Sequence, residues 1–82
     1  MARIISIEDS PALQRLLALT MRGSGIDIEA FLLGAPGLEA VMESPPDLIV
    51  LDLGLPDMSG WDILERLRSE PSTAHVPVVV AT

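Results

Sequence analysis

Hydrophobic and polar positions divide the chain into short blocks of two kinds. Two runs are apolar at nearly every position, which is typical of strands with both faces covered: residues 48–51 and 76–81. Residues 3–7 form a short β-branched run, which also predicts a strand. Residues 26–30 alternate instead, with Asp27 and Glu29 between apolar residues. They predict a half-exposed strand at a sheet edge, which the apolar residues 31–33 would extend. The pattern therefore predicts four strands.

Apolar residues at helical spacing lie between these strands. Ser10-Pro11 predicts the start of a first helix, because Ser caps free N–H groups and Pro fits a first turn, and Gly23 predicts its end. Residues 34–37 predict a loop before a short second helix that Pro45-Pro46 ends, and Ser59 predicts the cap of a third. The apolar stripes of the three helices are Leu13, Leu16, Leu17 and Met21, then Leu38, Val41 and Met42, then Ile63, Leu64 and Leu67.

Strands that alternate with helices predict an α/β domain with a parallel sheet and right-handed crossover connections. No internal repeat or linker divides the sequence, so residues 1–82 predict one small domain. A chain of this size buries only about 60% of its unfolded surface, which predicts marginal stability.

The composition excludes several classes of partner. The formal net charge is −7 and the five basic residues are all Arg, so no basic patch for nucleic acid or an anionic membrane is predicted. The absence of Cys excludes a disulfide framework and a zinc–thiolate cluster. No leader pattern opens the sequence, and no apolar run reaches the length of about 20 residues that a membrane span needs, so a cytoplasmic protein is expected.

Acidic residues follow two of the predicted strands. Glu8 and Asp9 come directly after the first strand, and Asp52 ends the apolar run of the third, before a loop rich in Gly and Pro. Ligands of open parallel sheets bind beyond the carboxyl ends of the strands, so these carboxylates are expected close together, with Thr82 after the last strand. Three carboxylates repel unless a cation neutralises them, and an all-oxygen set suits Mg²⁺. The pattern predicts a magnesium site for a phosphoryl group.

These residues resemble the receiver domain of two-component response regulators over the whole chain. The acidic pair Glu8-Asp9, the strand-end Asp52, the sequence Leu-Pro-Asp-Met-Ser-Gly at 55–60 and the hydroxyl of Thr82 stand in the order and roughly the spacing of that family. The resemblance implies a flavodoxin-like doubly wound parallel sheet with its strands in the order 2-1-3-4. It also implies a signalling domain rather than an enzyme.

The resemblance implies a role for each of these residues. Asp52 would accept a phosphoryl group from a histidine kinase or a phosphotransfer protein. Asp9, Asp52 and the backbone carbonyl of Gly54 would hold Mg²⁺, and Glu8 would act mainly through water molecules bound to the metal. The hydroxyl of Thr82 would hydrogen-bond a phosphoryl oxygen.

The sequence also departs from the family. A complete receiver continues with a helix, a strand that ends on Lys and a final helix; this sequence has no Lys, and it is expected to be a partial domain truncated after the fourth strand. The uncovered apolar edge at residues 76–81 predicts a homodimer. The alternative interpretation is a degenerate receiver fragment that associates with itself and is not phosphorylated.

Other classes of protein fit the sequence less well. The residues after the first strand offer no Gly-rich turn for a dinucleotide, and an aspartyl phosphatase carries a second Asp where this chain has Gly54. Taken alone, Glu8 and Asp9 could simply stabilise the N-terminus of the first helix through its dipole. Asp52 alone could be a strand-end acid bonded to a backbone N–H. His75 lies in a Pro-flanked loop and is interpreted as a solvated residue.

Overall fold

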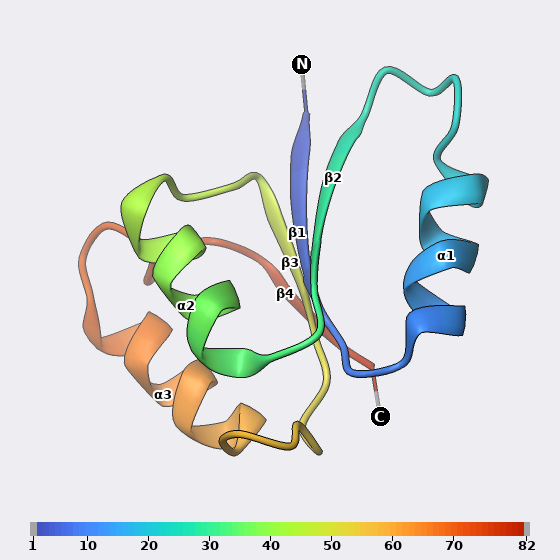
Figure 1. The fold of residues 1–82 in the computed structure, drawn as a ribbon. Helices are drawn as coiled ribbons and strands as arrows, with labels where there is room; N and C mark the ends of the chain where they lie inside the picture. The colour runs from blue at the N-terminus through green and yellow to red at the C-terminus, as the bar shows by residue number, and fades with distance from the viewer. Residues whose placement is uncertain (1, 82) are drawn as a thin grey trace.

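The computed structural model describes residues 2–81, which form one parallel sheet with helices on both of its faces (Figure 1). The strands lie in the order β2-β1-β3-β4, and every neighbouring pair is parallel. The predicted α/β class and strand order are therefore confirmed. In chain order the elements are β1 (Arg3–Ile7), α1 (Pro11–Thr20), β2 (Asp27–Phe31), α2 (Gly34–Glu43), β3 (Leu48–Leu51), α3 (Gly60–Ser69) and β4 (Val78–Val80).

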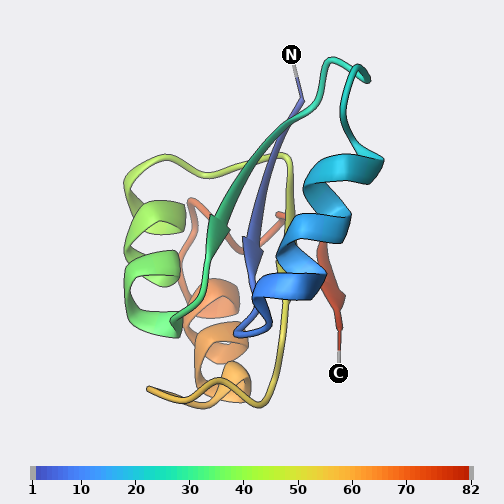
Figure 2. The ribbon, with the colours of Figure 1, turned by 45° about the vertical axis from the view of Figure 1, so that its right-hand side comes forward.

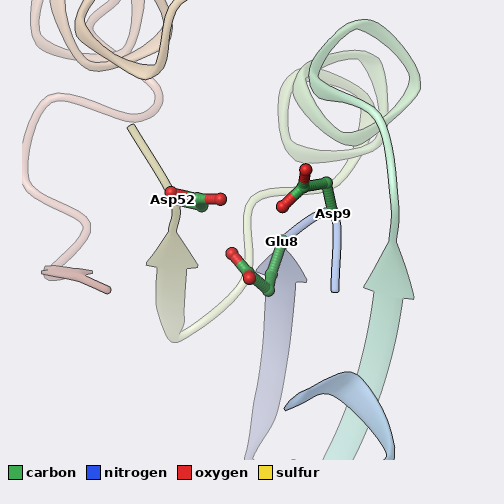
Figure 3. A group of neighbouring side chains, drawn as sticks. All are labelled: Glu8, Asp9 and Asp52. Atoms are coloured by element: carbon green, nitrogen blue, oxygen red, sulfur yellow. The ribbon is translucent and has the colours of Figure 1, made fainter. Parts of the chain in front are cut away.

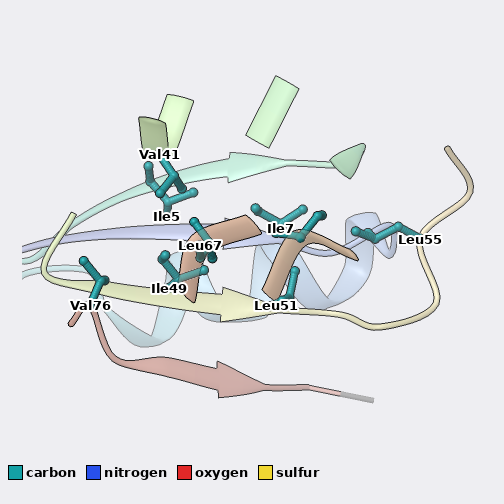
Figure 4. Packing of buried hydrophobic residues seen from close by; sticks show 9 residues of the cluster. Ile5, Ile7, Val41, Ile49, Leu51, Leu55, Leu67 and Val76 are labelled. Carbon is teal, nitrogen blue, oxygen red and sulfur yellow. The ribbon is translucent and has the colours of Figure 1, made fainter. Parts of the chain in front are cut away.

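The main core lies between the sheet and the pair α2 and α3, while α1 covers the opposite face (Figures 1 and 2). Side chains alternate between the two faces of a strand, so every second residue of β1 and β3 enters this core (Figure 4). Fully burying one such side chain contributes about 1.5–3 kcal/mol. The buried cluster consists of Ile5, Ile7, Val41, Ile49, Leu51, Leu55, Ile63, Leu67 and Val76.

The face under α1 is covered more thinly. Leu13 and Leu17 are half-buried, but Leu16 is 59% exposed, so its predicted place in the buried stripe is wrong. The buried residue of α1 is Gln14. Because α1 lies alone on its side of the sheet in the part of the chain that the structure describes, it can bury only a narrow stripe (Figure 2).

The start of α2 differs from the prediction. Residues 34–37 were expected to form a loop, and this expectation is wrong, because α2 begins at Gly34. The carboxylate of Asp57 accepts hydrogen bonds from the N–H groups of Gly34, at 2.7 Å, and of Ala35, at 2.8 Å, and so caps the helix from a distant loop. A Cβ on Gly34 would lie 2.6 Å from Cγ of Met58, and one on Gly37 would lie 2.7 Å from Cγ1 of Ile7. These glycines permit close packing rather than a loop.

The last strand is shorter than predicted. β4 covers Val78–Val80 rather than residues 76–81, because the N–H of Val76 donates to Thr73 in a turn and Pro77 has no N–H to donate. β4 pairs with β3, and among residues 2–81 no strand pairs with its other edge. The predicted helix caps are confirmed, since Ser10 accepts from the N–H of Leu13 and Ser59 from that of Trp61.

Arg3 fixes the end of the sheet where β1 begins. Its Nε lies 2.8 Å from Oε1 of Glu29 in β2, and its Nη1 donates to the carbonyl oxygen of Ser44, after α2, at 2.6 Å. Its backbone N–H donates to Oδ2 of Asp47, just before β3, at 2.8 Å. We call this set of contacts the Arg3 clamp; it joins three strands and one helix end through a single residue.

The Asp57 cap can be tested by substitution. Asp57→Ala removes both acceptors and should lower the midpoint of thermal unfolding at neutral pH, whereas Asp57→Asn keeps one oxygen and should lower it less. The N–H groups of Ala35 and Gly34 hold the pKa of Asp57 below its ordinary value. The stabilisation is therefore present above about pH 4 and is lost as the pH falls through the lower folded pKa. The gap in midpoint between the natural protein and Asp57→Ala should shrink below about pH 4; an undiminished gap there would contradict this assignment.

Candidate functional site

The register of the sheet brings Glu8 and Asp52 to the same edge. Ile7 of β1 pairs with Leu51 of β3, so Glu8 and Asp52 are the first residues beyond two neighbouring strands. The N–H of Asp52 donates to the carbonyl oxygen of Ile7 at 2.9 Å, and the N–H of Glu8 donates to that of Phe31 at 3.0 Å. The backbone ladder therefore continues one residue past the strands and fixes the position of both acids.

Glu8, Asp9 and Asp52 form an acidic cluster at this edge (Figure 3). One carboxylate oxygen from each residue lies within 4.8 Å of the other two. Glu8 and Asp9 extend from the end of β1 and Asp52 from the end of β3, toward a common space (Figure 3). Glu8 is buried, Asp52 is half-buried and Asp9 is exposed. The structure thus brings together the three acids that the sequence pattern singled out.

The surroundings of Glu8 and Asp52 shift the pKa values of these two acids in opposite directions. Burial, together with the neighbouring Asp52 and Asp9 carboxylates, raises the pKa of Glu8 to about 7. The pKa of Asp52 is lowered, first because the N–H of Gly54 donates to its Oδ1 at 3.0 Å and then because of Glu8. Near neutral pH Asp52 is therefore ionised, while Glu8 is divided between its charged and neutral forms. An ionised Asp52 is available as a nucleophile.

The loop after Asp52 is closed by Gly60. The N–H of Gly60 donates to the carbonyl oxygen of Leu53 at 3.0 Å, and Gly54 and Ser59 form a bridge across the loop. A Cβ on Gly60 would lie directly against the carbonyl oxygen of Asp52 and 2.5 Å from Cα of Leu53. Both of these atoms belong to the backbone and cannot move aside as a side chain can. Gly60, the first residue of α3, therefore packs directly against the backbone of Asp52 and Leu53.

The acidic cluster fits a hard divalent cation. Its ligands are all oxygens, and Oε2 of Glu8 is buried without a hydrogen-bond partner among residues 2–81. A buried polar atom without a partner costs free energy, and Mg²⁺, which binds through carboxylates, carbonyls and water, would satisfy it. The N–H of Gly54 already bonds Asp52, and the role of its carbonyl group as a metal ligand stays a prediction. Thr82, predicted to contact a phosphoryl group, lies outside the described residues.

Two residues with hydrogen bonds to distant parts of the chain were not predicted from the sequence. Asp57 lies within the Leu-Pro-Asp-Met-Ser-Gly sequence, but its hydrogen bonds to α2 join residues that are 22 and 23 positions apart. No local sequence pattern indicates such bonds. Gln14 lies between Leu13 and Leu17 in the apolar stripe of α1, and its amide reaches the carbonyl oxygen of Glu8. A polar residue within an apolar stripe was the available signal for it.

Comparison with known proteins shows the family. Residues 4–82 match the response regulator receiver domain, and the chain belongs to this family. The DNA-binding response regulator MtrA of Mycolicibacterium smegmatis is 40% identical over 80 residues, which cover 98% of this chain and 34% of MtrA. The chain therefore spans about a third of the length of this curated relative.

Solved structures share the fold. The N-terminal domain of a response regulator receiver protein from Methanoculleus marisnigri JR1 has a TM-score of 0.90 and 32% identity, over 100% of this chain and 67% of that one. The receiver domain of the sensor histidine kinase PA1611 from Pseudomonas aeruginosa PAO1, which has a magnesium ion coordinated in its active site cleft, has a TM-score of 0.90 and 22% identity, over 99% of this chain and 66% of that one. At that identity the second likeness concerns the fold alone.

The family inferred from the acidic residues and the motif at 55–60 is thus confirmed, and it is a family of two-component signal transduction. Receiver domains of this family bind Mg²⁺ in an acidic site, and this chain has an acidic cluster at the ends of β1 and β3. No helix within residues 2–81 is long and apolar enough to cross a membrane.

The packing of Gly60 against Asp52 predicts a difference between two glycines of the same loop. Gly60→Ala should destabilise the fold by about 1–3 kcal/mol, because the methyl group meets immovable backbone, and should weaken Mg²⁺ binding by displacing Asp52. Gly54→Ala is the matched control, since its Cβ would lie 3.9 Å from Oδ1 of Asp52, an ordinary contact. Urea unfolding and calorimetric titration with Mg²⁺ measure both effects. Equal behaviour of the two variants would contradict the proposed packing.

Proposed function

We propose that Asp52 accepts a phosphoryl group from a histidine kinase or a phosphotransfer protein, in a reaction that depends on Mg²⁺. The observation that carries this proposal is the acidic cluster, in which carboxylates from two strand ends lie within 4.8 Å of one another at the edge of a parallel sheet. Phosphoryl transfer requires a positioned nucleophile and stabilised charge on the transferred group more than it requires covalent activation. The acidic cluster supplies a nucleophile and a place for a cation.

Asp52 is the acid suited to be the nucleophile. Its lowered pKa keeps it ionised, and the bond from the N–H of Gly54 to Oδ1 leaves its other oxygen, Oδ2, without that constraint. One oxygen of Asp52 forms a bond to phosphorus while the bond from phosphorus to the imidazole nitrogen of the donor breaks, which produces an acyl phosphate. The freed imidazole takes up a proton from solvent.

Glu8, Asp9 and Asp52 would hold Mg²⁺, together with the backbone carbonyl of Gly54. When bound, the cation neutralises charge on the oxygens of the transferred group. The all-oxygen ligand set and the unpartnered Oε2 of Glu8 support this assignment. Glu8 would act mainly through water on the metal, and the hydroxyl of Thr82 would bond a phosphoryl oxygen.

The presence of all three acids favours a phosphorylated domain over a degenerate one. A fragment kept only for self-association has no need of a Glu8 whose burial and acidic neighbours raise its pKa. The proposal includes a cytoplasmic location, because phosphoryl donors derived from ATP are found there.

Phosphorylation can be tested with a small acyl phosphate. Incubation with acetyl phosphate and Mg²⁺ should add one phosphoryl group, seen by intact-mass spectrometry, and Asp52→Asn should abolish it because an amide is not a nucleophile here. Asp57→Asn is the matched control, since Asp57 belongs to the same loop but bonds the backbone of α2. Labelling that persists in Asp52→Asn, or that never appears in the natural protein while a complete receiver is labelled, would contradict the proposal.

We also propose that the 82-residue chain forms a homodimer through the open edge of β4. Val79 and Val80 are exposed, by 52% and 43%, and no charged residue lies in the strand. A strand edge with free N–H and C=O groups and no charge pairs readily with another strand. Parallel sheets are normally covered on both faces, and α1 covers its face of this sheet only in part.

The dimer can be tested by light scattering at tens of micromolar protein. Val79→Lys places a charge on the open edge and should shift the chain toward the monomer. Leu32→Lys is the matched control, because Leu32 is 47% exposed but follows β2, at the opposite edge of the sheet. A monomeric natural chain, or dissociation by Leu32→Lys instead of Val79→Lys, would contradict association through β4.

A further inference from the structure

Gln14 is the buried residue of α1, and its environment is polar at one end only. The side chain lies on the sheet side of the helix, flanked by the half-buried Leu13 and Leu17, and is 7% exposed. An amide placed there loses its hydration, so its hydrogen bonds within the protein decide whether it is tolerated.

The amide nitrogen of Gln14 meets three carbonyl oxygens. Its Nε2 lies 3.1 Å from the carbonyl oxygens of Ser6, Glu8 and Phe31. These oxygens come from β1, from the first residue beyond β1 and from the last residue of β2. Three acceptors around one atom also fix the orientation of the amide, because an oxygen in that position would face only other oxygens.

The contact with Glu8 differs from the other two. The N–H of Glu8 donates to Phe31, but β2 ends at Phe31 and no backbone N–H in the described part of the chain reaches the carbonyl oxygen of Glu8. Nε2 of Gln14 is the donor found for that oxygen. The carbonyl group of Glu8 belongs to the peptide that joins Glu8 to Asp9, so Gln14 restrains the orientation of this peptide.

The other end of the same amide is not satisfied. Oε1 of Gln14 is buried and has no hydrogen-bond partner among residues 2–81. A buried acceptor without a partner opposes folding, and an apolar residue of similar size would avoid it. The amide is therefore a poor choice for packing alone, and its donor group accounts for its presence.

From these contacts we infer that Gln14 is a positioning residue for the acidic cluster, and that it sets the Mg²⁺ affinity of the site by holding the Glu8–Asp9 peptide. The inference rests on the proposed function, since it concerns the same site. Rotation of this peptide would move the Glu8 and Asp9 carboxylates relative to Asp52. Groups that orient metal ligands in this way typically change metal affinity by about 10- to 100-fold when they are replaced.

The test compares Mg²⁺ affinity with stability in four proteins. Gln14→Met keeps the length of the side chain and removes the donor, and Gln14→Asn keeps an amide that is one methylene too short to reach Glu8. Leu17→Ala is the control, because it shortens a half-buried apolar side chain of the same helix, which makes no hydrogen bond to Glu8. Both Gln14 variants should bind Mg²⁺ about tenfold more weakly than the natural protein by calorimetry. Leu17→Ala should lower the urea midpoint and leave the Mg²⁺ affinity unchanged.

A second measurement does not depend on the metal. The amide proton of Glu8, bonded to Phe31, should exchange with solvent faster in both Gln14 variants than in Leu17→Ala when no Mg²⁺ is present. Unchanged Mg²⁺ affinity in folded Gln14 variants would overturn the inference and leave the proposed function standing. If the natural protein binds no Mg²⁺, the magnesium part of the proposed function fails together with the claim about Mg²⁺ affinity, and the exchange rate of Glu8 decides whether Gln14 holds the Glu8–Asp9 peptide. Loss of folding in both Gln14 variants would make Gln14 purely structural and overturn it.

Discussion

Carboxylates repel one another, and one carboxylate oxygen from each of Glu8, Asp9 and Asp52 lies within 4.8 Å of the other two. Much of the fold opposes this repulsion. The parallel register of β1 and β3 sets Glu8 beside Asp52, Gln14 holds the carbonyl group of Glu8, and Gly60 packs against the backbone of Asp52. The acids are therefore close together before any ligand arrives. A site assembled in this way needs little rearrangement when charge enters it, which is the property that electrostatic catalysis and cation binding share.

Local patterns in the sequence account for the parts of the structure that were predicted. The apolar run that ends on Asp52 marks a buried strand because each face of that strand meets other elements, and the alternation of strands with helices fixes the α/β class. Once the strands are parallel, their carboxyl ends share one edge, which brings Glu8 and Asp9 to Asp52. The order of the strands is not a local property, and it followed from the resemblance to receiver domains.

The parts that were not predicted depend on contacts between distant residues. The start of α2 at Gly34 depends on Asp57, 23 positions away, and the sequence around Gly34 reads as a loop without that cap. The exposure of Leu16 depends on how many helices share the α1 face, which periodicity within one helix cannot reveal. Gln14 belongs to the same class, because its partners lie on β1 and β2 and only the folded chain brings them together.

The Arg3 clamp lies at the opposite end of β1 from the acidic cluster, roughly 17 Å away for a strand of five residues at about 3.3 Å each. By joining Arg3 to Glu29 and to Asp47, it fixes β1 lengthwise against β2 and β3. A slip by one residue would carry Glu8 about 3.3 Å past Asp52 and turn its side chain to the other face. The clamp thus fixes the strand register, and the register determines the distance between the carboxylates. An ion pair at one end of the sheet therefore sets the spacing of like charges at the other.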